Sequence, residues 1–92
     1  MAIKVKFMSN LKGVTGTQSV KLDTSFKTFE DVMNELLRLY PQLEDEMFYS
    51  DGTIDFAYQI MLNGKRLMYP DDKDVKVKNG DEIVFMVFMA GG

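Results

Sequence analysis

The sequence predicts a small α+β domain in which one helix packs across one face of a β-sheet. Two observations lead to this prediction. Short segments that alternate apolar and polar residues, or that are rich in β-branched and aromatic residues, lie before and after one long stretch with helical spacing. Glycine-containing pairs typical of turns separate these strand-like segments. The predicted order is two strands, one helix and then further strands.

The first two strands are expected at the start of the chain. Residues 3–7 alternate apolar and polar side chains with period two, which is typical of a half-buried strand. Residues 17–22 supply Thr, Val and Leu for a second strand, and Gly13 and Gly16 predict a turn between the two. We expect the two strands to pair as a hairpin.

One helix is predicted directly after them. Its apolar residues form a continuous stripe at helical spacing: Phe29, Val32, Met33, Leu36, Leu37 and Tyr40. Thr28 is the candidate N-cap, and Asp31 three residues later gives a weaker form of the capping box. Pro41 is expected to end the helix.

The second half of the chain is expected to return to strands. Residues 44–55 are acidic and irregular and predict an exposed loop, in which residues 47–49 are candidates to pack one edge against the core. The pair Asn63-Gly64 between two strand-like segments is a strong hairpin signal. The last strand is predicted from about Asp81 to Phe88.

Composition excludes several classes of protein. The 92 residues are 46% hydrophobic and 27% charged, as in ordinary globular domains. No apolar run approaches the roughly 20 residues that span a bilayer. We therefore expect a single cytoplasmic domain over residues 1–92, without contact with a membrane.

The absence of two residue types restricts the possible chemistry. The chain has no cysteine and no histidine, so it has no thiolate nucleophile and lacks the usual general base and the commonest metal ligand. We expect no bound metal or cofactor and no self-contained active site. Eleven basic residues, scattered among fourteen acidic ones, argue against a nucleic-acid surface.

The last strand is apolar on both of its faces. Alternation divides it into Ile83, Phe85 and Val87 on one face and Val84, Met86 and Phe88 on the other. One explanation is a central strand covered on both faces, with the acidic loop as the second cover. The alternative, which we favour, is an exposed docking patch with Met86 and Phe88 as its most exposed members.

The chain ends in Gly91-Gly92, a pair expected by chance in roughly one sequence in two hundred. A frayed end is one explanation. Without a Cβ, however, a glycine tail of about residues 89–92 can enter a narrow channel. The carboxylate of Gly92 is then the one reactive group of the tail, and a partner enzyme would have to activate it.

Five stretches, read together, carry a family resemblance. They are residues 3–11, the helical TFEDVMNELLRLYPQL at 28–43, Leu62-Asn63-Gly64, residues 79–83 and Gly91-Gly92. The combination resembles the small β-grasp sulfur carriers of the MoaD/ThiS group, specifically the small subunit of molybdopterin synthase, and the related archaeal ubiquitin-like modifiers. Family members commonly have Pro-Pro where this chain has Val87-Phe88, which leaves the modifier branch open.

The resemblance implies a ubiquitin-like β-grasp fold, with a mixed sheet and one main helix across one face. It also implies that a ubiquitin-activating-type enzyme uses ATP to adenylate the Gly92 carboxylate. Sulfur then converts the adenylate into a thiocarboxylate, which the large subunit of molybdopterin synthase uses to build molybdenum cofactor. Gly91 would supply tail flexibility, and Met86, Phe88 and Val84 would bind both partners.

Two rival functions share much of this sequence signature. In one, the activated Gly92 forms an isopeptide bond with lysines of target proteins, as in a ubiquitin-like modifier. In the other, the chain is a β-grasp interaction module whose terminal glycines are incidental.

Overall fold

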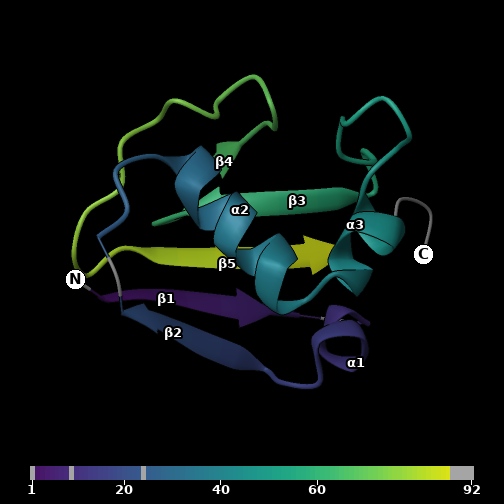
Figure 1. Ribbon diagram of the computed structural model, residues 1–92, viewed down its shortest axis with the longest axis horizontal. Coiled ribbons are helices and arrows are strands. Elements are labelled where there is room, and N and C mark those ends of the chain that lie inside the picture. Colours follow the sequence, from purple (N-terminus) through teal and green to yellow (C-terminus); the bar gives the residue numbers. More distant parts are fainter. Residues whose placement is uncertain (1, 9, 24, 88–92) are drawn as a thin grey trace.

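The strands of the computed structural model form one mixed sheet in the order β2-β1-β5-β3-β4 (Figure 1). The structure describes residues 2–8, 10–23 and 25–87. The strands are β1 (Ala2–Phe7), β2 (Ser19–Asp23), β3 (Tyr58–Leu62), β4 (Lys65–Leu67) and β5 (Glu82–Val87). β1 and β5 run parallel in the middle, and the other neighbouring strands pair antiparallel. The predicted α+β class and mixed sheet are confirmed.

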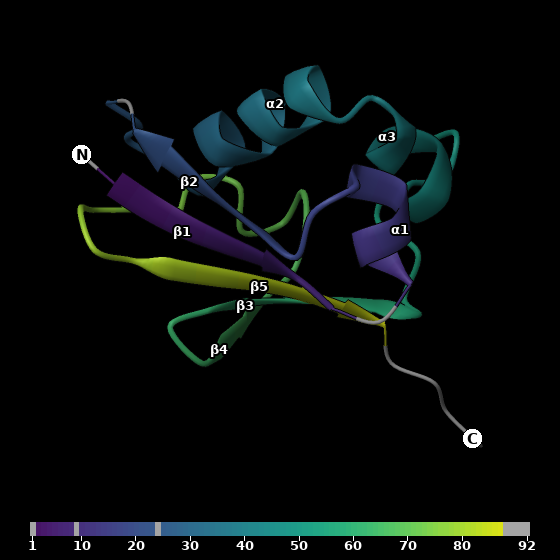
Figure 2. The same ribbon diagram turned by 90° about the horizontal axis from the view of Figure 1, so that it is seen from below.

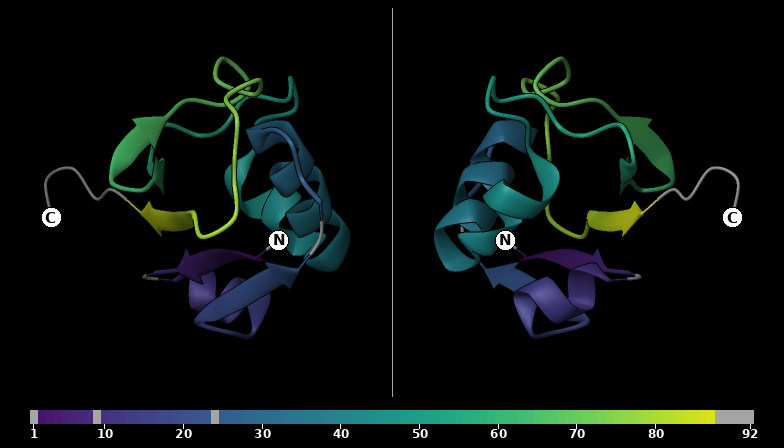
Figure 3. Two further views of the ribbon diagram at one scale, coloured as in Figure 1. Left: turned by 90° about the vertical axis from the view of Figure 1, so that its left-hand side faces the viewer. Right: turned by 90° about the vertical axis from the view of Figure 1, so that its right-hand side faces the viewer.

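The helices gather on one side of the sheet (Figure 2). They are α1 (Leu11–Thr15), α2 (Phe29–Leu39) and α3 (Gln42–Met47). The sheet curves around α2 and α3, which lie on its concave side (Figure 3). In the described part of the chain no helix covers the opposite side, which we call the open face. No described helix has the length and apolar character to cross a bilayer.

The main helix begins as the sequence predicts. The Thr28 hydroxyl accepts a hydrogen bond from the Asp31 amide at 3.3 Å, and an Asp31 carboxylate oxygen accepts one from the Thr28 amide at 3.1 Å, which completes a capping box. The same oxygen accepts the Lys27 amide at 2.9 Å. These amide donors stabilise the charged carboxylate and lower the pKa of Asp31 below its ordinary value of 3.8.

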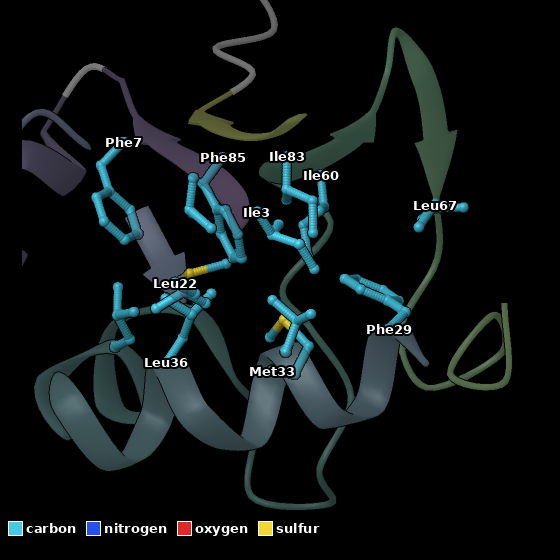
Figure 4. Packing of buried hydrophobic residues seen from close by; sticks show 14 of the residues in the cluster. Ile3, Phe7, Leu22, Phe29, Met33, Leu36, Ile60, Leu67, Ile83 and Phe85 are labelled. Carbon is cyan, nitrogen blue, oxygen red and sulfur yellow. The ribbon is translucent and has the colours of Figure 1, made fainter. Parts of the chain in front are cut away.

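The hydrophobic core lies between α2 and the sheet (Figure 4). From the helix, Phe29, Met33 and Leu36 point toward the strands. From the sheet, the facing residues include Ile3, Phe7, Leu22, Ile60, Ile83 and Phe85, all of them buried. Alternate residues of each strand therefore fill this core, and the residues between them point to the open face.

The connection between the first two strands differs from the prediction. β1 and β2 do pair antiparallel, but a short helix, α1, lies between them where we expected only a turn. Leu11 of α1 is fully buried in the core. Gly16 caps the helix with a positive φ of 79°, a backbone conformation that favours glycine. Gly16 therefore ends a helix rather than only marking a turn.

The acidic segment also differs from the prediction of an exposed loop. Residues 42–47 form α3, whose Leu43 and Met47 are buried while Glu44, Asp45 and Glu46 are exposed. An apolar side on so short a helix consists of two residues, too few for a visible periodicity. The packing of Met47 and the partly buried Phe48 against the core is confirmed, whereas Tyr49 is 46% exposed.

The predicted hairpin at Asn63-Gly64 is confirmed and has a second role. Both residues have positive φ, 49° and 84°, as a tight two-residue turn between twisted strands requires. The side-chain Nδ2 of Asn63 donates to an Asp81 carboxylate oxygen at 2.9 Å, and its side-chain Oδ1 accepts a hydrogen bond from the Glu82 backbone amide at 2.9 Å. Asn63 thereby fixes the start of β5 against the β3–β4 hairpin.

Candidate docking face and carboxyl-terminal tail

β5 lies at the centre of the sheet and leads directly to the tail. It runs parallel to β1, with Phe7 opposite Phe85, and antiparallel to β3. The Met8 amide donates to the Phe85 carbonyl at 2.9 Å, so the ends of β1 and β5 are held together. Residues 88–92 lie outside the described part of the chain. The roles assigned to Phe88, Gly91 and Gly92 therefore stay predictions.

The two apolar sets of β5 have different surroundings. Ile83 and Phe85 face the helices and are completely buried. Val84 and Met86 point to the open face and are half-buried. The acidic segment that we considered as a second cover contributes α3, which packs against α1 and α2 on the other side of the sheet. In the described part of the chain the acidic segment therefore does not cover the open face, and the docking role of Met86 and Phe88 stays a prediction.

A third apolar residue extends this patch. Met61 of β3 pairs directly with Val84, is half-buried and points to the open face because Ile60 and Leu62 point inward. We call Met61, Val84 and Met86 the apolar strip. Sequence reasoning missed Met61, although the Asn63-Gly64 turn and a buried Ile60 together would have assigned it to this face.

Basic side chains share the open face with the apolar strip. Those on strands are Lys4 and Lys6 of β1, Lys21 of β2 and Arg66 of β4. Lys6 lies in the position opposite Val84, and its ammonium group is 3.5 Å from a Glu82 carboxylate oxygen. These residues are scattered in the sequence, and the sheet brings them to one face. Arg66 is exposed and lies opposite Met61 in the β3–β4 pair.

The acidic run Asp71-Asp72-Lys73-Asp74 lies in the turns between β4 and β5. An Asp72 carboxylate oxygen accepts a hydrogen bond from the Met68 amide at 2.7 Å. The Lys73 ammonium nitrogen lies 3.9 Å from an Asp74 carboxylate oxygen, which makes an ion pair. Among the described residues there is no group of acidic side chains placed to hold a metal ion. The expectation that the chain holds no cofactor stays a prediction.

The mixed sheet with its helices on one side defines a ubiquitin-like β-grasp protein. The sequence matches the ThiS family over residues 5–92, and the chain belongs to this family. The predicted resemblance to small carrier proteins without a catalytic site of their own is thereby confirmed. Comparison with curated proteins finds no significant match.

Solved structures share the fold over nearly the whole chain. Small archaeal modifier protein 1 from Haloferax volcanii superposes with a TM-score of 0.83 at 24% identity, covering 100% of both chains. The protein of the same name from Methanosarcina acetivorans superposes with a TM-score of 0.79 at 26% identity, covering 99% of this chain and 96% of the other. A protein from Pyrococcus furiosus that is proposed to be molybdopterin converting factor, subunit 1, superposes with a TM-score of 0.75 at 16% identity. The superposition covers 97% of this chain and 99% of the other.

Proposed function

We propose that the chain is a sulfur carrier whose Gly92 carboxylate is activated as an adenylate and converted to a thiocarboxylate. The observation that supports this most is the ThiS-family match, which extends through Gly91-Gly92 in a chain that has no cysteine. Sulfur therefore has no side-chain thiol on which it could be carried. The carboxyl terminus is the position left for it.

The chemistry needs a partner at each step. The Gly92 carboxylate attacks the α-phosphate of ATP in the active site of an adenylating enzyme of the ubiquitin-activating type, and pyrophosphate leaves. A persulfide on a donor protein then attacks the acyl carbon and displaces AMP, which forms an acyl disulfide between the tail and the donor. A second thiol of the partner attacks the donor's sulfur, so that the S–S bond breaks, the thiocarboxylate is released and the donor is left as a disulfide. The chain itself supplies the tail and the docking face. We assign this activation to the cytoplasm, where ATP is available.

The docking face proposed for these partners is the apolar strip together with Phe88. Half-buried Val84 and Met86 lie on the strand that leads to the tail, so a partner bound there would sit beside the residues it must activate. Methionine suits a surface that meets more than one partner, because its side chain is flexible and polarizable. The same face would meet the adenylating enzyme and then the large subunit of molybdopterin synthase.

We propose a pterin precursor of molybdenum cofactor as the sulfur acceptor. This proposal rests on the resemblance of the sequence to molybdopterin synthase small subunits, and it agrees with the fold shared with the Pyrococcus furiosus protein.

A second candidate is conjugation of Gly92 to lysines of target proteins. It is favoured by the 26% identity to the Methanosarcina acetivorans modifier protein and by Val87-Phe88 where sulfur carriers commonly have Pro-Pro. Activation of Gly92 is common to both functions, and they differ in what attacks the activated carbonyl.

The deciding experiment is the intact mass of the chain after incubation with ATP, the host adenylating enzyme and a sulfur donor. We expect a gain equal to the replacement of one oxygen by sulfur. Deletion of Gly92 should abolish it while the thermal midpoint stays unchanged, because glycine has no side chain that could pack in a core. Adenylate without sulfur, followed by conjugates of higher mass in cells, would favour the modifier. Full cellular function after removal of both glycines would favour an interaction module.

A further inference from the structure

The β1–β2 half of the open face, beside the apolar strip, carries lysines (Figure 1 shows the strands). Lys4, Lys6 and Lys21 point to this face because the alternate residues of their strands fill the core. Lys4 and Lys6 line a hollow of about 650 Å³ together with Lys12 of α1. Lys4 and Lys21 line a second hollow of about 400 Å³. We call Lys4, Lys6 and Lys21 of the open face, together with Lys12 of α1 at the shared hollow, the cationic strip.

The charge of this face opposes the charge of the chain. The strand residues that point to it include four cations, Lys4, Lys6, Lys21 and Arg66, and two carboxylates, Asp23 and Glu82. Four minus two leaves an excess of two positive charges on the face, whereas the whole chain has a net charge of −3. The remainder of the chain therefore carries −5, and the molecule is electrostatically polarised.

The arrangement of the lysines is unfavourable for the fold alone. Lys4 and Lys21 are direct partners in the antiparallel β1–β2 pair, and like charges in opposite positions destabilise a sheet. Among the described residues, only Lys6 of the strip forms an ion pair, with Glu82. In the part of the chain that the structure describes, Lys4, Lys12 and Lys21 form no ion pair with a carboxylate. The strip thus presents uncompensated positive charge around two hollows.

We propose that the cationic strip binds an acidic strip on the surface of the adenylating partner, alongside an apolar ridge that covers Met61, Val84 and Met86. The inference rests on the proposed function, because it takes the open face as the docking face for that enzyme. Complementary charge at the border of an apolar contact accelerates association and orients the two surfaces. On this proposal, Lys6 and Lys12 orient the bound chain so that its tail is directed toward the active site of the adenylating enzyme.

The test uses the double variant Lys4→Gln/Lys21→Gln in the full chain. Association with the host adenylating enzyme is measured at low and high ionic strength, together with the thermal midpoint. We expect the association rate at low ionic strength to fall about tenfold, and the difference to shrink at high salt. The thermal midpoint should stay equal or rise, because the like-charge pair is removed. Lys4→Arg/Lys21→Arg should keep the wild-type rate.

The matched control is Lys76→Gln/Lys78→Gln, which changes the net charge equally at two exposed lysines outside the strip. Equal association rates and salt dependence for the two Gln doubles would overturn the inference. A lower thermal midpoint for the Lys4/Lys21 double would also overturn it, because the strip would then stabilise the fold. If the wild type is still adenylated in either case, the proposed function stands. A wild type that neither binds the enzyme nor is adenylated overturns both.

Discussion

The two faces of β5 have nearly the same amino-acid composition and different surroundings. Ile83 and Phe85 are completely buried beneath the helices, whereas Val84 and Met86 are half-buried on the open face. The strand itself does not cause the difference, because both sets are apolar and alternate regularly. It arises because the helices lie on one side of the sheet (Figure 2). Apolar character thus identifies a central strand, and the position of the helices decides which side chains are left for binding.

The largest expected effect comes from the buried face. Phe85→Ala removes a fully buried ring whose centroid is 5.7 Å from that of Phe7, so we expect a loss of about 3–5 kcal/mol in the free energy of unfolding. The matched change on the open face, Met86→Ala, should cost about 1 kcal/mol or less. Denaturant unfolding of both variants measures the contrast. Equal losses would contradict the assignment of the two faces.

The next effect separates docking from stability on the open face. Met86→Asp puts a charge into the apolar strip, so we expect the affinity for the adenylating enzyme to fall at least about tenfold. The fold should persist, because the side chain is not part of the core. Leu39→Asp is the control, since it makes the same kind of change on the exposed side of α2. Unchanged affinity of the Met86 variant would refute the docking role.

A smaller effect concerns α2, the helix that buries one face of the sheet. Thr28→Ala removes the side-chain acceptor for the Asp31 amide, and we expect a loss of about 1 kcal/mol in the free energy of unfolding. Ser25→Ala, at an exposed serine shortly before the helix, should change stability little. Thermal unfolding compares them, and a loss no larger for Thr28 would show that the capping box is dispensable.

The smallest expected effect is a pH dependence of the stability that the Asp31 carboxylate contributes at the start of α2. The pKa of Asp31 is lowered in the folded state by hydrogen bonds from the Lys27 and Thr28 amides. A group with a lowered folded pKa adds stability above its unfolded value, here 3.8, and that stability is lost as the pH falls through the folded pKa. Asp31→Asn should therefore flatten the fall of the thermal midpoint as the pH is lowered below about 4. Identical slopes for the two proteins would contradict this.

Local signals were sufficient for part of the fold. The α2 stripe, its capping box and the Asn63-Gly64 turn each depend on residues within one element, and each is confirmed. The two short helices, by contrast, were not predicted, because local signals do not identify them. A helix of five or six residues shows too little periodicity to be recognised, and α1 and α3 are defined by the burial of Leu11, Leu43 and Met47 in the shared core.

The candidate site divides in the same way. Val84 and Met86 were predictable because alternation within one strand places them on the same face. Met61 and the cationic strip were not predicted, because they come from other elements and meet only through strand pairing. The sequence suggested scattered basic residues, and the register of β1 with β2 is what places Lys4 opposite Lys21.

The sequence by itself determined the class of fold, the main helix, the central strand and the absence of cysteine and histidine chemistry, because these follow from local spacing and composition. It also provided the Gly91-Gly92 ending and the family resemblance. Only the tertiary structure decided which apolar set of β5 is buried, and which lysines surround the other set. The physical reason is that burial and charge clustering depend on which segments, distant in the chain, the sheet brings together.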